Sequence, residues 1–472
     1  MKRSLLSTLA FTVLTFSAPA LSAPQTVDGT ARSGLRLTIY NNGMALIDDR
    51  RSVVFDKGIN ILNLLGVSPG LIEGSARVVS SRPFNILEQG YLADNLSPSE
   101  VLKAHVGKPV TVIKSNPKTG LETAVDADLI SIRKGIILRI DGHIETAPPG
   151  RIVFPQIPSH LHDQPIFRIS GTAPTGGETG LGLSYLSNGY SWAATHTLTL
   201  NDTMDAVDLH TWASLKNTSG LDIKNAVVQV FAGDVQRRSR GIRSPQMPEM
   251  RLTKAMAADV QPLPGRQSLG GFHLYSLVDK IDLADKTQKQ VSLLRIRALP
   301  ISRELVSLAQ ANPHAPMRGT PNPTHPNIRL TLSNDKATGS SLPIPGGIAR
   351  VYGQDRQGRS QFLGEDHLQD LPIAAKTSIS IGRAFDVTVN RRQTDFRREG
   401  LGRNTFEMAY RLNVTNGGMR AEKVKIAEVM SGDWTILKQS HEHSREDNRA
   451  VWRVTIPPKG EVTITYRVRT KL

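Results

Sequence analysis

The sequence predicts a mainly β protein: antiparallel β-sandwich domains with a small inserted SH3-like or Sm-like barrel and one short helix. Apolar and polar residues alternate with a period of two along most of the chain, as in strands with one buried face. Turn-forming residues separate these runs, and the chain holds 39 glycines and 28 prolines. Only one segment carries clear signals for the start and stop of a helix. These observations favour packed antiparallel sheets.

Residues 1–22 have the composition of a secretory signal peptide. Lys2 and Arg3 form a basic start, residues 5–16 are mostly apolar, and small residues follow. The apolar part is too short to span a bilayer, and we expect cleavage after Ser22. We therefore expect an exported protein, periplasmic if the cell has two membranes. No later apolar run has the length of a membrane span, so we expect no transmembrane segment.

Residues 23–95 form the expected N-terminal β segment. Alternating runs at 37–40, 52–55 and 59–62 predict strands. The tripeptide at 56–58, which ends in glycine, predicts that the last two of these strands pair as a hairpin.

Residues 96–155 predict the inserted barrel and its helix. Ser97 is placed to cap a helix that starts at Pro98, with Glu100 completing a capping box. Gly107 fits the left-handed position that ends such a helix. Closely spaced strands follow, at 109–114, 127–133, 136–140 and 151–154. The chain has no cysteine, and a small closed barrel would protect its strand edges without disulfides.

Residues 156–300 and 328–472 predict two β-sandwiches, because strand-like runs follow one another with turn residues between them. Residues 237–271, within the first sandwich, have no packing pattern and begin with a basic run. The proline-rich residues 301–327 separate the two sandwiches. We predict both irregular stretches to be long exposed loops.

Three blocks of sequence resemble a known family. The blocks are Gly182-Leu183-Ser184-Tyr185-Leu186-Ser187-Asn188-Gly189-Tyr190-Ser191-Trp192, then Leu209-His210-Thr211-Trp212-Ala213-Ser214-Leu215-Lys216-Asn217 with Val230-Phe231-Ala232-Gly233-Asp234, and Leu342-Pro343-Ile344-Pro345-Gly346-Gly347 with Phe362-Leu363-Gly364-Glu365-Asp366. Together they make residues 37–472 similar to a bacterial family of uncharacterised exported proteins. That family is related to the C-terminal half of the mucoidy-inhibitor-A-like proteins. The resemblance implies a β-rich envelope protein with no assigned enzymatic activity. The long coiled-coil heptads of the mucoidy inhibitors are missing from this sequence, so we expect no role that depends on them.

The charge balance is strongly basic. The chain carries 58 Lys and Arg against 42 Asp and Glu, a formal net charge of +16. Without Lys2 and Arg3 the balance is 56 − 42 = +14. Such an excess attracts anionic partners over long range, although it also serves solubility alone. We therefore expect an envelope protein, an anionic polymer or lipid head groups as the partner, and no nucleic acid. No pattern in the sequence indicates a cofactor or an oligomeric state.

Two groups of arginines are the candidate binding residues, because guanidinium groups hold phosphates and carboxylates through paired hydrogen bonds. The candidates are Arg237, Arg238, Arg240, Arg243, Arg391, Arg392, Arg397 and Arg398. The simpler interpretation is a solvated run of charge. Aromatic residues are sparse near both groups, which argues against nucleic-acid stacking. We expect a non-catalytic binding or structural module, and the basic stretch 237–266 is the best candidate for its contact with the partner.

The alternative function is that of a periplasmic hydrolase. Ser191 lies in a stretch that approaches a nucleophile elbow, but a strand pattern follows where the motif needs a helix. His160 and His162, or His441 and His443, could share a metal from one face of a strand. No third ligand stands at a recognisable spacing, so surface histidine is the simpler reading of both pairs.

Three further residues are expected to act structurally. Trp192 and Trp212 would anchor the core of the first sandwich, because aromatic side chains bury large areas. Asp234 would cap backbone N–H groups in a turn, or bind a cation together with Asp222.

Overall fold

The computed structural model describes residues 23–93, 96–148, 150–158, 161–233, 235, 266–269, 271–311, 316, 319, 322–335, 342–399 and 404–472. The expected signal peptide lies outside these residues. So do the candidates Arg237, Arg238, Arg240 and Arg243, together with His160 and Asp234. The chain divides into two compact units. The first consists of Met1–Ser191 and Lys216–Gln288, and the second of Trp192–Leu215 and Lys289–Leu472.

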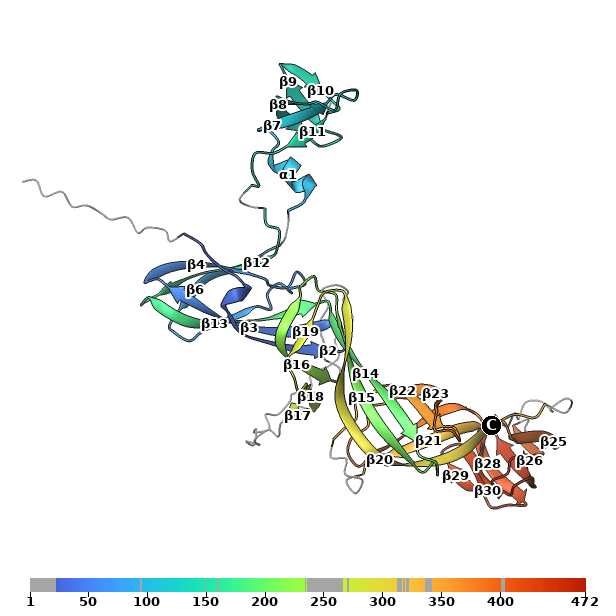
Figure 1. The fold of residues 1–472 in the computed structure, drawn as a ribbon. Helices are drawn as coiled ribbons and strands as arrows, with labels where there is room; N and C mark the ends of the chain where they lie inside the picture. The colour runs from blue at the N-terminus through green and yellow to red at the C-terminus, as the bar shows by residue number, and fades with distance from the viewer. Residues whose placement is uncertain are drawn as a thin grey trace, which may run out of the picture. The chain divides into compact units, whose positions relative to one another are not determined.

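The described residues of the first unit form strands, one helix and one 3-10 turn (Figure 1). Its elements are β1 (Gln25–Val27), η1 (Gly29–Ala31), β2 (Arg32–Tyr40), β3 (Met44–Phe55), β4 (Gly58–Leu65), β5 (Arg77–Ser80), β6 (Asn85–Leu92), α1 (Pro98–Ala104), β7 (Pro109–Ser115), β8 (Glu122–Ser131), β9 (Ile137–Ile140), β10 (His143–Glu145), β11 (Arg151–Val153), β12 (Ile166–Ala173), β13 (Gly177–Asn188), β16 (Ile223–Ala232), β17 (Arg266–Leu269), β18 (Phe272–Ser276) and β19 (Ile281–Leu283). They form a sheet in the order β1-β4-β12-β6, a second in the order β17-β18-β16-β2-β3-β13-β5 with β19 beside β16, and a third in the order β10-β9-β8-β7-β11. The mainly β prediction is confirmed.

The predicted helix is confirmed as α1. The Ser97 hydroxyl accepts a hydrogen bond from the Glu100 amide at 3.2 Å, and Pro98 occupies the first turn. Gly107 has a φ of 79°, the left-handed conformation expected just after the helix. Leu102 packs against the core of the third sheet, so the helix belongs to this small β unit.

The small β unit is an open sheet in the described residues. Its order places β10 at one edge and β11 at the other, and among the described residues no strand pairing joins these two edges. Each edge strand is only three residues long. Because such short strands offer few hydrogen bonds, the expected closure into a barrel is not completed here.

The predicted hairpin at 56–58 is wrong. β3 pairs with β2 and β13, whereas β4 pairs with β1 and β12 in the other sheet. The Asn60 side chain holds the corner between them, accepting from the Asp56 amide at 2.8 Å and donating to the Asp56 carbonyl oxygen at 2.8 Å. Both strands alternate, and alternation alone does not tell a hairpin from a corner between two sheets.

The second unit contains the remaining strands. They are β14 (Tyr190–Leu200), β15 (Ala206–Asn217), β20 (Thr287–Gln310), β21 (Asn327–Ser333), β22 (Gly347–Gln354), β23 (Ser360–Leu368), β24 (Lys376–Arg383), β25 (Val387–Glu399), β26 (Thr405–Asn416), β27 (Glu422–Val429), β28 (Asp433–Gln439), β29 (Ser444–Glu446), β30 (Arg449–Ile456) and β31 (Glu461–Lys471). One sheet runs β23-β22-β14-β15-β20-β27-β30-β29, with β21 on β20 and β24 on β21, and a second runs β25-β26-β31-β28. Figure 1 shows β20 as one long curved strand. It continues past residue 300, where the sequence suggested a domain boundary.

We call the second of these sheets, together with the parts of β20, β27 and β30 that pack on it, the C-terminal sandwich. The core of this sandwich includes residues from both layers, among them Leu305, Val424 and Trp452 on one side and Leu412 and Tyr466 on the other. None of the helices in the described residues is long and apolar enough to cross a bilayer.

One local construction occurs three times. A buried asparagine stands at or just after the end of β15, β21 and β26, and its side-chain amide donates to carbonyl oxygens of two different connections. The donors and acceptors are Asn217 to Leu221 and Leu283, Asn334 to Leu342, Leu371 and Pro372, and Asn416 to Arg420, Ile456 and Pro457, at 2.8–3.4 Å. Because buried amides are expensive to leave unpaired, each asparagine fixes the two connections to each other.

The geometry of the second connection is also repeated. Three residues after Leu283, Leu371 and Ile456 comes a residue with positive φ: Lys286 at 57°, Ala374 at 63° and Lys459 at 52°. Few residues other than glycine adopt this conformation. Its recurrence at the same place shows that the three loops share one design.

Candidate anion-binding surface

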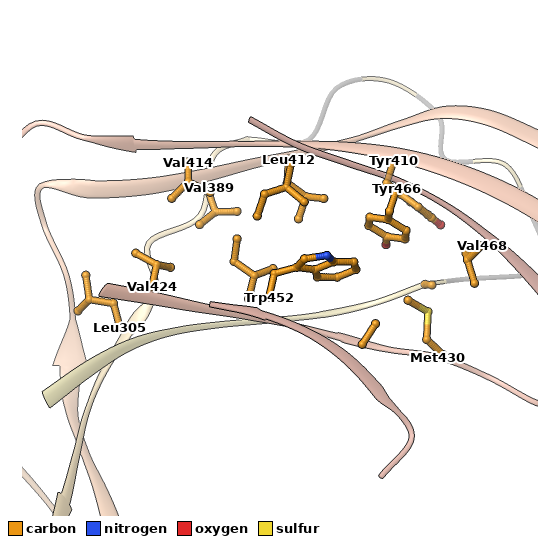
Figure 2. Close-up of a cluster of buried hydrophobic side chains, with 14 of the residues drawn as sticks. Leu305, Val389, Tyr410, Leu412, Val414, Val424, Met430, Trp452, Tyr466 and Val468 are labelled. Atoms are coloured by element: carbon orange, nitrogen blue, oxygen red, sulfur yellow. The ribbon is translucent and has the colours of Figure 1, made fainter. Parts of the chain in front are cut away.

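The sheet β25-β26-β31-β28 has two different faces. Along β26, Met408, Tyr410 and Leu412 are buried, while Arg411 between them is exposed. β31 alternates in the same way, with Tyr466 buried. Figure 2 shows the inward side chains of both strands lying against Trp452 from the opposite layer. One face therefore supports the fold, and the other is available to solvent.

The inner face is aromatic. Trp452 is fully buried, and its ring centroid lies 4.7 Å from that of Tyr466, which in turn lies 5.2 Å from that of Tyr410. The Trp452 indole N–H donates to the His441 carbonyl oxygen at 3.1 Å, so its polar atom is satisfied. Such rings bury a large area in one well-defined arrangement.

Arg391, one of the candidate binding residues, belongs to this interior. Its guanidinium donates to both carboxylate oxygens of Glu428 at 2.9 Å and lies 4.0 Å from the ring centroid of Tyr410. Glu428 has no exposed surface. Burial raises the pKa of Glu428, and the Arg391 charge and hydrogen bonds oppose that rise. The pairing holds the pKa of Arg391 above its ordinary value although burial acts in the other direction. Arg391 is thus committed to an internal ion pair.

The outer face carries Arg397 and its neighbours in a continuous network. Asp395 accepts from Arg467 at 2.7 Å and pairs with Arg397 at 3.1 Å. Glu407 lies 3.6 Å from Arg467 and 2.6 Å from Arg469. The hydrogen bond from Arg467 lowers the pKa of Asp395, and the charge of Arg397 acts in the same direction. Three arginines therefore share two carboxylates.

Arg392 and Arg411 complete this face without a carboxylate. They stand directly opposite each other on β25 and β26, and both are exposed. In the part of the chain that the structure describes, neither makes an ion pair with an acidic side chain. Lys438, also exposed, stands opposite Arg467 on β28 and β31. Directly opposed like charges destabilise a sheet slightly, so the fold itself gains nothing from this arrangement.

We call this surface the basic face. Its members are Arg392, Asp395, Arg397, Glu407, Arg411, Lys438, Arg467 and Arg469. The acidic residues Asp433 and Glu461 stand on the same sheet toward its two ends, opposite Lys471 and Thr415. Arg398 does not join the network, because its guanidinium lies over the Phe406 ring at 5.2 Å. The centre of the sheet is left with uncompensated guanidinium groups that can hold phosphate or carboxylate oxygens.

The described histidine candidates are engaged with other side chains or stand apart from a metal-ligand group. The His441 ring bonds the Ser440 hydroxyl at 2.9 Å, and the His443 ring bonds the Gln439 side chain at 2.6 Å. His443 lies between Trp434 and Trp452, each with its ring centroid 6.0 Å away. His162 is half-buried in the first unit. Across the described residues, no group of three or more potential metal ligands is found.

The remaining candidates lie in regular strand. Ser191 is half-buried within β14 and, in the described residues, no hydrogen bond joins its side chain to a histidine or a carboxylate. Trp192, the next residue, is buried. Trp212 is half-buried on β15, with its ring 4.0 Å from that of His210.

Sequence reasoning missed a second buried ion cluster, in the first unit. Asp49 accepts from Arg32 at 2.8 Å and from Arg51 at 2.7 Å, and both Asp49 and Arg51 are buried. Burial would raise the pKa of Asp49, but the hydrogen bonds from Arg32 and Arg51 lower it overall. The available signal was the position of Asp49 and Arg51 at i and i+2 on one strand, which puts both side chains on one face.

Comparison with known proteins places the basic face inside a recognised domain. Residues 181–472, more than half of the chain, match a domain of unknown function, DUF4139. The matched region begins within β13 and includes the whole C-terminal sandwich. The search of curated proteins gave no match. The chain therefore belongs to the DUF4139 family.

Proposed function

We propose that this is an exported envelope protein that binds an anionic envelope component through the basic face, without catalysing a reaction. The resemblance to the C-terminal half of the mucoidy-inhibitor-A-like proteins and the signal-like residues 1–22 support the envelope setting. The net charge of +16 favours encounter with a negatively charged partner.

The observation that carries the proposal is the pair Arg392 and Arg411. Both guanidinium groups are exposed, directly opposed and without an acidic partner in the described part of the chain. Two opposed side chains on one sheet face stand about 5 Å apart at Cβ, close enough to share one phosphate or carboxylate. A bound anion would replace their mutual repulsion with charge-assisted hydrogen bonds.

The test is a double substitution, Arg392→Gln with Arg411→Gln, in the full chain. The probe is soluble polyphosphate, which has charge but no acyl chain, and binding is measured by titration calorimetry at low and at physiological salt. We expect binding to weaken roughly thirtyfold, because two charge-assisted hydrogen bonds of on the order of 1 kcal/mol each are lost. The remaining affinity should also depend less on salt.

The matched control is Arg297→Gln with Arg356→Gln. These residues are exposed in the same unit but lie outside the basic face, so the control removes the same net charge. Equal weakening in both double variants would show that net charge, and not this surface, holds the polyanion, and would refute the proposed site.

A further inference from the structure

Three connections meet at one end of the C-terminal sandwich. They are residues 384–386 between β24 and β25, 417–421 between β26 and β27, and 457–460 between β30 and β31. The Gly417 amide donates to the Asp386 carbonyl oxygen at 2.7 Å, and the Lys459 amide donates to the Gly418 carbonyl oxygen at 3.1 Å. We call this group of loops the sandwich tip.

Two large apolar side chains project from the sandwich tip. Phe385 is 89% exposed and Met419 is 80% exposed, more than any other large apolar side chain in the described part of the second unit. The nearest ring to Phe385 is His325, stacked at a centroid distance of 6.5 Å, and the His325 ring is itself held by the Ala384 and Val387 carbonyl oxygens. Folding therefore leaves both apolar groups in water.

Basic residues outnumber acidic ones on and beside these connections. Arg383 at the end of β24, Arg420 and Lys459 are exposed, against two exposed acidic residues, Asp386 and Glu461 at the start of β31. Among the described residues, Arg383 and Arg420 make no ion pair with a carboxylate. Apolar side chains near cations suit the boundary between anionic head groups and acyl chains.

Several backbone groups of the sandwich tip are already hydrogen-bonded. Asn416 donates its amide to the Arg420 and Pro457 carbonyl oxygens at 2.8 and 3.1 Å, and its side-chain oxygen accepts from the Gly418 amide at 2.9 Å. The Gly460 amide bonds the Pro457 carbonyl oxygen at 3.2 Å. Loops that enter a poorly hydrated layer must bring few unpaired polar groups with them.

A second loop of the chain shows whether an asparagine-tied turn requires an exposed apolar residue. The loop tied by Asn217 is built in the same way, with the Ser219 amide donating to the Asn217 side-chain oxygen at 3.0 Å. It carries Thr218, Ser219 and Gly220, small or polar residues, where the loop tied by Asn416 carries Gly418 and Met419. The asparagine tie therefore forms without an exposed apolar residue, although the backbones differ at the third loop position, where Gly220 has a φ of 81° and Met419 has no positive φ.

We propose that the sandwich tip inserts Phe385 and Met419 into the interface of an anionic lipid bilayer, with Arg383, Arg420 and Lys459 against the head groups. This inference deepens the proposed function by naming a bilayer as partner, and it rests on that function for the envelope setting. It can be tested separately from the basic face, because it depends on loop residues and on acyl chains. Transfer of a large apolar side chain out of water is favourable enough for each of the two to strengthen binding roughly tenfold.

The direct test uses the absence of cysteine from the chain. Met419→Cys gives a single site for an environment-sensitive fluorophore, and Leu308→Cys, exposed on β20, gives the matched control site. With vesicles of phosphatidylglycerol and phosphatidylethanolamine, we expect a blue shift and quenching by brominated lipid at residue 419 only. No response at residue 419, or an equal response at residue 308, would overturn the proposal.

The second test is co-sedimentation of unlabelled variants with the same vesicles and with phosphatidylcholine vesicles. We expect Phe385→Ser with Met419→Thr to weaken binding to anionic vesicles about a hundredfold. Leu308→Ser with Phe362→Ser, two exposed apolar residues elsewhere in the unit, should leave it unchanged. Thermal unfolding midpoints should stay at the wild-type value in both double variants.

The two proposals fail separately. A tip variant that still binds soluble polyphosphate but not vesicles supports the insertion and leaves the basic face intact. Unchanged vesicle binding by the tip variant refutes insertion whatever the polyphosphate result. Equal binding of the wild-type chain to phosphatidylcholine would refute the role given to the basic residues of the sandwich tip.

Discussion

The two faces of the sheet β25-β26-β31-β28 share the same strands but obey different constraints. The inner face holds Tyr410, Tyr466 and Arg391, each fixed by a ring, an ion pair or both. The outer face holds Arg392 and Arg411, which no packing or pairing requires. A side chain that the fold does not need and that repels its neighbour is a better guide to function than a buried one. The comparison predicts that substitutions will affect stability on one face and binding on the other.

The largest effect is expected for Trp452→Ala. This ring lies at the centre of the inner layer in Figure 2 and has no exposed surface. Its removal leaves a cavity and should lower the free energy of unfolding by about 3–5 kcal/mol. Urea unfolding followed by circular dichroism measures this loss, and a loss below about 1 kcal/mol would mean that the inner face is not the packed core described here.

The next effect concerns the buried ion pair. Glu428→Leu leaves the Arg391 guanidinium without its carboxylate and should cost about 3 kcal/mol, because a buried charge loses its partner. Arg391→Met in the same chain removes the stranded charge and should recover most of that loss. If the double variant is no more stable than Glu428→Leu, the unpaired Arg391 charge is not the cause of the lost stability.

A third prediction concerns a buried titratable group away from this sheet, and asks whether its burial alone lowers stability when the pH falls. His196 on β14 is buried, its ring bonds the Thr211 hydroxyl at 2.9 Å, and burial lowers its pKa to about 4. The unfolded chain, with a histidine pKa of about 6.5, then binds a proton between these values that the folded chain does not. The contribution of His196 is present above about pH 6.5 and is lost as the pH falls toward 4.

The free energy of unfolding lost through His196 amounts to about 2 kcal/mol between pH 7 and pH 5. Urea unfolding of wild type and His196→Gln at both pH values measures it. The variant should lose less stability on acidification than the wild type. Equal losses in the two proteins would contradict a depressed pKa at this position.

The smallest effect on stability is expected on the outer face, and it tests most directly the difference between the two faces. Arg392→Gln with Arg411→Gln should change the free energy of unfolding by no more than about 0.5 kcal/mol, with relief of repulsion making a slight gain more natural than a loss. The same urea titrations measure it. A loss above about 1.5 kcal/mol would show that the outer arginines support the fold, and the reason for treating them as a binding surface would disappear.

Much of the β architecture could be predicted from alternation and turn residues, and α1 from its capping box. What the sequence did not show is which face of a strand meets which layer. The sequence therefore groups Arg391 with Arg392, although adjacent residues of a strand point to opposite faces and only Arg391 faces Glu428. For the same reason β3 and β4 resembled a hairpin. Those decisions depend on long-range partners that no local pattern records.

The exposure of Phe385 and Met419 was equally hidden from sequence analysis. Single apolar residues beside glycine or aspartate give no periodic signal, and most apolar residues in such positions pack somewhere. Only the loop geometry, with Asn416 holding the connections together, shows that these two do not.

The tie at Asn416 also has a chemical consequence. Asn416 precedes Gly417, the sequence in which an asparagine most readily cyclises and deamidates. In the folded chain the Asn416 amide is held by three carbonyl oxygens, and the Gly417 nitrogen that would attack it is engaged with the Asp386 carbonyl oxygen. Folding therefore protects Asn416 from deamidation. A chain kept hot and unfolded would accumulate aspartate or isoaspartate at residue 416. When such a chain refolds, the new carboxylate would lie against three carbonyl oxygens to which it cannot donate a hydrogen bond.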